Sequence, residues 1–106
     1  MAERLEMRLI DQHKAIIAAL CQRHGVRRLY VFGSILSDRF SEDSDIDLLV
    51  DFSGVDLKHY ADNYYNFKFA LEEALHHPVD LIEEKALRNP FFKQSVEAQR
   101  QLLYAA

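Results

Sequence analysis

The sequence is poor in the residues that cross-link or break a chain: one cysteine, three glycines and two prolines among 106 residues, and no tryptophan. A lone Cys21 excludes an internal disulfide and any zinc site built from several cysteines. It is typical of the reducing cytosol, where we expect this chain to reside. The low glycine and proline content excludes a collagen-like chain, and 49% hydrophobic residues exclude a disordered one. No apolar run approaches the roughly 18 residues of a membrane span, so no membrane segment is expected.

Positive charge is scarce as well. Thirteen lysines and arginines oppose seventeen aspartates and glutamates, which gives a net charge of −4. A chain of this charge offers no basic surface for a phosphate backbone, so we expect no direct nucleic-acid binding. The length is that of one domain, and no repeat or low-complexity linker divides it. Residues 1–106 are therefore predicted to form a single domain.

Hydrophobic periodicity predicts that helices and short strands alternate along the chain. Pro78 ends one predicted helix, and Asn89 followed by Pro90 is typical of an N-cap and a first helical residue. The predicted elements are, in order, a helix up to His24, strands over 28–32 and 45–52, a helix over 56–77, a strand over 79–82 and a helix from Pro90 to about Tyr104. This order indicates an α/β or α+β fold in which helices pack on a small sheet.

The predicted helices carry the side chains expected to form the core. In the first helix these are Leu5, Leu9, Ile10, Ile16, Ile17, Leu20 and Cys21. In the helix over 56–77 they are Tyr60, Tyr64, Phe67, Leu71 and Leu75. Aromatic residues over 60–67 are denser than one helix face needs, which indicates a contact with a partner as well. Phe91 and Phe92 are expected to anchor the last helix to the sheet, although one of the two rings can be left for an interface.

Two short polar motifs follow or begin predicted strands. Gly33 and Ser34 come directly after a strand, before a helical turn expected over 35–38. Glycine lets the backbone approach a ligand closely, and the turn amides and the serine hydroxyl can donate to phosphate oxygens. Asp45 and Asp47 lie two residues apart at a strand start, so their carboxylates project from one face about 7 Å apart along the chain. Such carboxylates can flank the divalent cations of a two-metal site.

Asp80 lies in an otherwise apolar strand, where an unpaired charge would be costly. A metal ion between neighbouring strands would remove that cost, but Asp80 could also cap a helix or pair with Lys85 or Arg88. Taken singly, Gly-Ser is most often an ordinary turn and Asp-x-Asp can be a solvated outer face. The three features together, in this order, favour a phosphoryl-type transferase.

The residues Gly-Ser at 33–34, SDIDLLVDF at 44–52 and PVDLI at 78–82 resemble the motifs of small nucleotidyltransferases of the DNA polymerase β superfamily. Within it they are most similar to the minimal nucleotidyltransferases, which are often encoded beside a HEPN-domain protein. The resemblance covers nearly the whole chain. It implies the nucleotidyltransferase fold, a small mixed β-sheet flanked by helices.

The resemblance also implies a site. A nucleoside triphosphate, ATP in the simplest case, would be held by Gly33 and Ser34. Mg²⁺ would be held by Asp45, Asp47 and Asp80, and this third carboxylate would help to deprotonate the attacking hydroxyl. Oxygen ligands suit Mg²⁺, and nucleotidyl transfer depends mostly on positioning and charge neutralisation, so the chemistry agrees with the resemblance.

One position departs from the family pattern. Many relatives have an arginine in the turn after Gly-Ser, where this chain has Ser37. Either Arg39 replaces that arginine as a nucleotide-binding residue, or the triphosphate is held more weakly. The adjacent pair His76 and His77 is expected to be a polar helix end rather than a metal site, because neighbouring helical residues do not share a face.

The function that the resemblance implies is transfer of AMP from ATP to a hydroxyl, most economically a tyrosine of a HEPN toxin for which this chain is the antitoxin. The chain is expected to act in a homo- or hetero-oligomer, because so small a core leaves no room for an acceptor site. Two alternatives stay open: a catalytically silent antitoxin that binds the HEPN protein by contact, and a nucleotidyltransferase acting on a small molecule.

Overall fold

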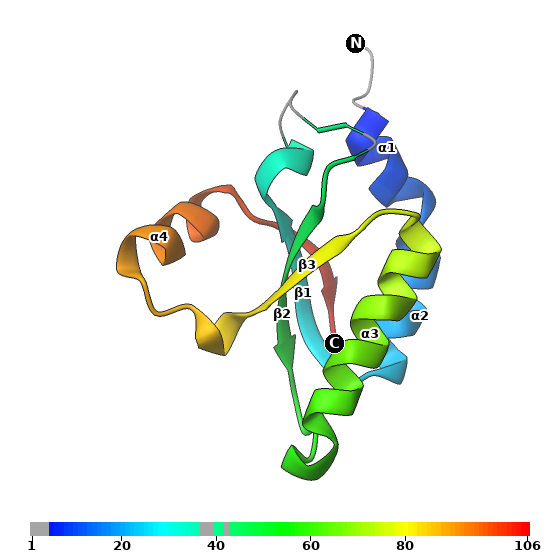
Figure 1. The fold of residues 1–106 in the computed structure, drawn as a ribbon, viewed down its shortest axis with the longest axis vertical. Helices are drawn as coiled ribbons and strands as arrows, with labels where there is room; N and C mark the ends of the chain where they lie inside the picture. The colour runs from blue at the N-terminus through cyan, green and yellow to red at the C-terminus, as the bar shows by residue number, and fades with distance from the viewer. Residues whose placement is uncertain (1–4, 37–39, 42) are drawn as a thin grey trace.

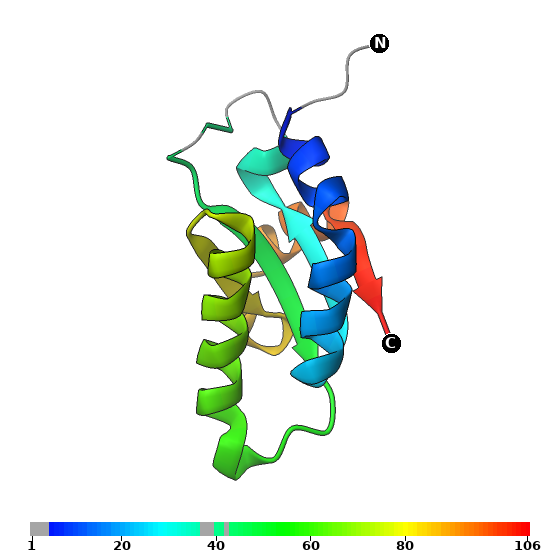
Figure 2. The same ribbon diagram turned by 90° about the vertical axis from the view of Figure 1, so that its right-hand side faces the viewer.

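The computed structural model describes residues 5–36, 40, 41 and 43–106; Ser37 and Arg39 lie outside the described residues. Its helices and strands are α1 (Leu5–Gln12), α2 (Lys14–Arg23), β1 (Val26–Phe32), β2 (Ile46–Phe52), α3 (Tyr60–Leu75), β3 (Val79–Glu83), α4 (Pro90–Gln99) and β4 (Gln101–Ala105). The strands form one sheet in the order β3-β2-β1-β4. Helices α1, α2 and α3 cover one face of the sheet and α4 lies on the other, as Figure 1 and Figure 2 show.

The sheet is mixed, as predicted for this fold class. Its strand β2 pairs antiparallel with β1 and parallel with β3, and β1 pairs antiparallel with β4. Helix α3 forms the crossover that a parallel pair requires. On β2, Ile46 and Leu48 face the α2–α3 side, whereas Leu49 is buried under α4. Burial on both faces explains why apolar residues dominate this strand.

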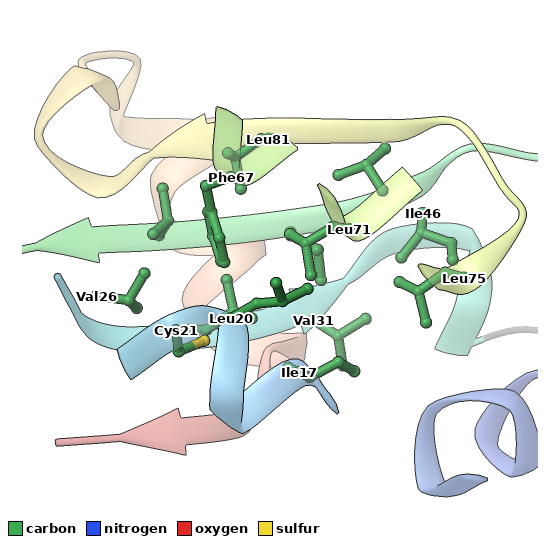
Figure 3. Close-up of a cluster of buried hydrophobic side chains, with 14 of the residues drawn as sticks. Ile17, Leu20, Cys21, Val26, Val31, Ile46, Phe67, Leu71, Leu75 and Leu81 are labelled. Carbon is green, nitrogen blue, oxygen red and sulfur yellow. The ribbon is translucent and has the colours of Figure 1, made fainter. Parts of the chain in front are cut away.

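Two cores of unequal size hold the layers together. The larger one lies between the sheet and helices α2 and α3, and includes Ile17, Phe67 and Leu71 (Figure 3). Burying a side chain of this kind contributes about 1.5–3 kcal/mol. The smaller core, on the other face, consists of three buried residues: Phe32, Leu49 and Val96. Helix α4 is therefore attached much more lightly than α2 or α3.

The single opening helix predicted from the sequence is two helices, with the break at His13. The His13 main-chain N–H donates to the Ile10 carbonyl, and its ring Nδ1 lies 2.8 Å from the Leu9 carbonyl that a regular helix would pair with that N–H. The expected buried stripe is also partly wrong. Ile16 is 45% exposed, while Ile10 and Ile17 face the core.

The last helix ends at Gln99, so its predicted extension to Tyr104 is wrong. Residues Gln101–Ala105 form β4 instead, because the free edge of β1 accepts this apolar segment as an antiparallel partner. Phe92 packs edge-on against Phe32, as an anchor would. Phe91, by contrast, is 81% exposed and anchors nothing among the described residues.

Candidate active site

Asp47 lies at the centre of the candidate site, because β2 is flanked by strands on both sides. In the strand register Asp47 stands opposite Phe32 of β1 and opposite Asp80 of β3. Residues directly opposite each other project from the same face of a sheet. Leu49, two residues along the strand, packs under α4, so both aspartates project from the α4 face. The structure thus brings together two acids that lie 33 positions apart in the sequence.

The Gly33-Ser34 turn folds over Asp47. It belongs to a short 3-10 helix, η1 (Gly33–Leu36), that follows β1 directly. Gly33 has a φ of +80°, in the left-handed region that favours glycine, and a Cβ added there would overlap Oδ2 of Asp47. The Ser34 main-chain N–H donates a hydrogen bond to the Asp47 carboxylate. The missing glycine side chain is what lets the turn and the acid approach each other.

The carboxylate of Asp47 lies in an electrostatically unfavourable place. Its pKa is raised above the ordinary value, first because the group is partly buried and then because Asp80 and Asp45 place negative charge nearby. The hydrogen bond from Ser34 acts in the opposite direction and lowers the pKa. A cation bound here would relieve the repulsion among three carboxylates.

Asp45 and Asp80 form the rim of the site. Both side chains are exposed, which corrects the expectation that Asp80 is a charge enclosed by apolar neighbours. Asp80 lies on the face that α4 covers only in part, so water reaches its carboxylate. No ion pair in the described part of the chain includes Asp80, and the alternative pairing with Lys85 or Arg88 is not found there.

The donor chemistry of this site fits Mg²⁺. Asp45, Asp47 and Asp80 offer carboxylate oxygens, and a magnesium ion completes such a set with water and substrate phosphates. Within the described residues no three histidine, cysteine, aspartate or glutamate side chains converge into a finished metal site. The negative charges of Asp80 and Asp45 nevertheless lie near enough to Asp47 to contribute, after burial, to its raised pKa.

A residue that sequence reasoning missed completes the turn. The Gly33 main-chain N–H donates to Oε1 of Gln99 over 3.3 Å, and Nε2 of Gln99 lies 3.4 Å from Oγ of Ser95. Gln99 is the last residue of α4, 66 positions from Gly33. No local pattern could reveal this contact, because it depends on α4 ending at that residue and crossing the sheet beside η1.

The segment leading into β2 is held by the chain after α3. The Ile46 N–H donates to the Pro78 carbonyl over 2.9 Å, and the His77 ring packs on Phe40 with 5.1 Å between centroids. Nδ1 of His77 lies 3.3 Å from the Ser44 carbonyl. His77 lies just beyond the end of α3 and its ring makes a polar contact, as predicted for a polar residue at a helix end.

Two surface hollows of about 390 Å³ each lie away from the carboxylates. One is lined by charged residues that include Arg28 and Lys85, and the other runs between α2 and α3. Neither of these two hollows touches Asp47 or the Gly33 turn, so neither belongs to the candidate site. None of the described helices has the length and apolar character to cross a membrane.

The profile of the nucleotidyltransferase domain family matches residues 13–103. The chain belongs to this family. This nucleotidyltransferase is 34% identical over 95 residues to Protein adenylyltransferase MntA of Thermococcus cleftensis, covering 84% of this chain and 91% of the relative. It is 32% identical over 89 residues to a Methanocaldococcus jannaschii protein assigned as a protein adenylyltransferase, covering 84% of this chain and 85% of the relative.

Solved structures agree on the fold of this nucleotidyltransferase. A structure assigned as a minimal nucleotidyltransferase is 32% identical and has a TM-score of 0.73. The match covers 94% of this chain and 98% of the chain in that structure. An MNT antitoxin in complex with a tri-AMPylated HEPN toxin of Shewanella oneidensis is 21% identical, with a TM-score of 0.63 over 92% of this chain and 73% of that one. A toxin–antitoxin structure with AMP-PNP is 23% identical, with a TM-score of 0.66; the match covers 91% of this chain and 74% of that one. The predicted minimal nucleotidyltransferase fold is confirmed.

Proposed function

We propose that this chain is a Mg²⁺-dependent protein adenylyltransferase that transfers AMP from ATP to a hydroxyl, most simply a tyrosine, of a HEPN-domain partner and so acts as its antitoxin. The observation that carries the proposal is the Gly33-Ser34 turn closed over Asp47, with Asp45 and Asp80 at the rim. Relatives that share about a third of their residues with this chain are named or assigned as protein adenylyltransferases.

Each residue has a defined part in the proposed reaction. Asp45, Asp47 and Asp80 would hold the metal ion, which would supply charge neutralisation to the phosphates when bound. Gly33 and Ser34 would donate hydrogen bonds to the triphosphate tail. The acceptor oxygen attacks the α-phosphorus in line, the bond to the β-phosphate oxygen breaks, and pyrophosphate leaves. Asp80, exposed at the rim, would take the proton of the acceptor hydroxyl.

The HEPN-domain partner is proposed from the chemistry of the site and from relatives of the same fold. The carboxylates lie at an open rim, so the acceptor can be carried on another protein that reaches them from outside. One relative of this fold is an MNT antitoxin in complex with a tri-AMPylated HEPN toxin. A partner that presents a hydroxyl next to Asp80 would serve as both binding partner and substrate.

The test is label transfer. The purified chain is incubated with Mg²⁺ and ATP labelled at the α-phosphate, with and without a candidate HEPN-domain partner protein. We expect one or more partner tyrosines to gain AMP, as read by gel autoradiography and mass spectrometry, and no labelling when Mg²⁺ is chelated. A partner that forms a complex but gains no label would indicate inhibition by contact alone. Label appearing on a free small molecule instead would overturn the choice of acceptor.

A further inference from the structure

We propose that Phe92 of α4, supported by Phe32, is the nucleobase platform of this site. The inference rests on the proposed function, because it names the part of the site that would hold the base of the nucleotide. The sequence pattern did not indicate a nucleobase site here: the two phenylalanines of the last helix were expected to be anchors, with one ring left for an interface.

Phe32 lies beside Asp47 on the sheet. It stands directly opposite Asp47 in the β1–β2 register, so its ring projects from the same face as the carboxylate. The ring is 4% exposed and belongs to the smaller core with Leu49 and Val96. Phe32 is therefore a fixed apolar surface immediately beside the acidic site.

The ring of Phe92 contacts Phe32 and stays partly exposed. Its centroid lies 6.3 Å from that of Phe32 and the two planes meet at 73°, so the rings do not cover each other face to face. Phe92 remains 43% exposed despite this contact. Its main-chain N–H donates to the Asn89 side chain, which fixes the start of the helix. An aromatic ring that packs on one neighbour and stays partly open to solvent is what a stacked base needs.

Phe92 shares one side of α4 with a residue that is buried against the sheet and a residue that contacts the Gly33 turn. Phe92, Val96 and Gln99 are spaced four and three residues apart, so they lie on one side of the helix. Val96 is buried against the sheet, and Gln99 accepts the Gly33 N–H. One helix face therefore reaches both the phosphate-binding turn and the aromatic pair, with the carboxylate of Asp47 on the sheet below. A nucleotide with its triphosphate at the turn can place its base on Phe92.

An aromatic face has consequences for selectivity. Every base has a π-face, so stacking supplies affinity without choosing strongly among bases.

Phe91, the preceding residue, is 81% exposed and has no ring contact among those found in the described residues. It offers a matched control on the same helix, with the same side chain and without the support of Phe32.

The experiment compares ATP with inorganic tripolyphosphate, which lacks the base, by isothermal titration calorimetry. Phe92→Ala should weaken ATP binding about tenfold or more and leave tripolyphosphate binding within twofold of the original protein. Phe91→Ala should change neither affinity. Phe92→Trp should restore ATP binding. Because the chain has no tryptophan, the fluorescence of this variant should be quenched by ATP and not by tripolyphosphate.

Each outcome decides the proposal. ATP affinity unchanged in a folded Phe92→Ala protein overturns the platform, as does an equal loss for ATP and tripolyphosphate. Unchanged ATP affinity with reduced transfer to the HEPN protein would assign the ring to the acceptor instead. Should Phe92→Ala fail to fold, the quenching of Phe92→Trp by ATP alone provides the same test. If the original protein binds neither ATP nor tripolyphosphate, the proposed function itself fails.

Discussion

Asp47 combines two opposing demands, because the charge that would bind a cation destabilises the folded protein when no cation is present. Its pKa is raised by burial and by Asp80 and Asp45. We predict that Asp47→Asn lowers transfer at least a hundredfold, as loss of a metal ligand should. Its melting temperature in metal-free buffer should equal or exceed that of the original protein, because a repulsive charge is gone.

Calorimetric melting and the label-transfer assay check the two halves of this prediction. Asp43→Asn is the matched control, since Asp43 is exposed in the same acidic segment. We expect it to change neither quantity appreciably. A large drop in the melting temperature of Asp47→Asn would mean that the carboxylate is a structural acceptor for Ser34 rather than a ligand site.

A comparison of alanine variants at Gly33 and Gly54 distinguishes the cost of a left-handed backbone from the cost of steric overlap. Both have positive φ, +80° and +67°, but a Cβ at Gly33 meets Asp47 whereas one at Gly54 meets nothing within 4 Å. Gly54→Ala should therefore cost about 1 kcal/mol in urea unfolding, from the left-handed backbone alone. Gly33→Ala should cost more than that and also weaken ATP binding in calorimetry. Equal costs at the two positions, with normal ATP binding, would contradict the close approach of turn and acid.

Cys21 gives the protein a predictable response to alkaline pH. Burial raises the pKa of its thiol from 9.0 to about 12. The folded state keeps the proton above pH 9 while the unfolded chain releases it, so stability falls as the pH rises from 9 toward 12. We expect the original protein to lose about 1 kcal/mol more than Cys21→Ala between pH 8 and pH 10, in urea unfolding at each pH. Parallel curves for the two proteins would show that the thiol is not buried in solution.

At the residue scale, the sequence identifies candidate site residues but not their surroundings. The acids at 45, 47 and 80 and the Gly33-Ser34 pair stand out because those residue types are costly or unusual beside strands. The exposure of Asp80 depends on how far α4 reaches over β3, and the role of Gln99 depends on where α4 ends. Both are tertiary facts that a local pattern does not contain.

At the scale of elements, predictability followed burial. The strand β2 and the helix α3 were predicted in kind, because a regular apolar period marks a face that must be buried, but α3 spans Tyr60–Leu75 rather than the predicted 56–77. The strand β4 was missed, since the free edge of β1 decides its conformation rather than its own five residues. The break at His13 was missed because it comes from one side chain competing for a helix carbonyl.

Helix α4 should behave as a separately opening unit, because Val96 is its only fully buried side chain among the described residues. We predict that Val96→Ala costs about 1–3 kcal/mol, and that hydrogen exchange accelerates mainly within Pro90–Gln99. Val50→Ala, in the larger core, is the control and should accelerate exchange across the whole sheet. Uniform acceleration in both variants would show that α4 opens only with global unfolding.

At the scale of the whole molecule, an apolar surface on α3 remains exposed after both cores are filled. On the outer side of α3, Tyr65 and Phe69 are 52% and 56% exposed and their rings stack with 6.0 Å between centroids. The Lys68 ammonium lies 5.9 Å from the Phe69 centroid. Exposed aromatic residues that contact one another are typical of protein-binding surfaces, and the sequence had indicated an excess of aromatics here.

We predict that this α3 surface binds the HEPN-domain partner. The double variant Tyr65→Ser and Phe69→Ser should weaken complex formation at least tenfold in light scattering and calorimetry, because central aromatic residues carry most of the energy of an interface. Its melting temperature and ATP affinity should stay unchanged, since neither side chain belongs to the core or to the candidate site. The control Leu102→Ser removes a residue of equal exposure, 56%, on β4 at the opposite edge of the sheet from β3 and should bind normally. If Leu102→Ser abolishes binding and the double variant does not, the partner contacts the β4 edge and the prediction for the α3 surface is wrong.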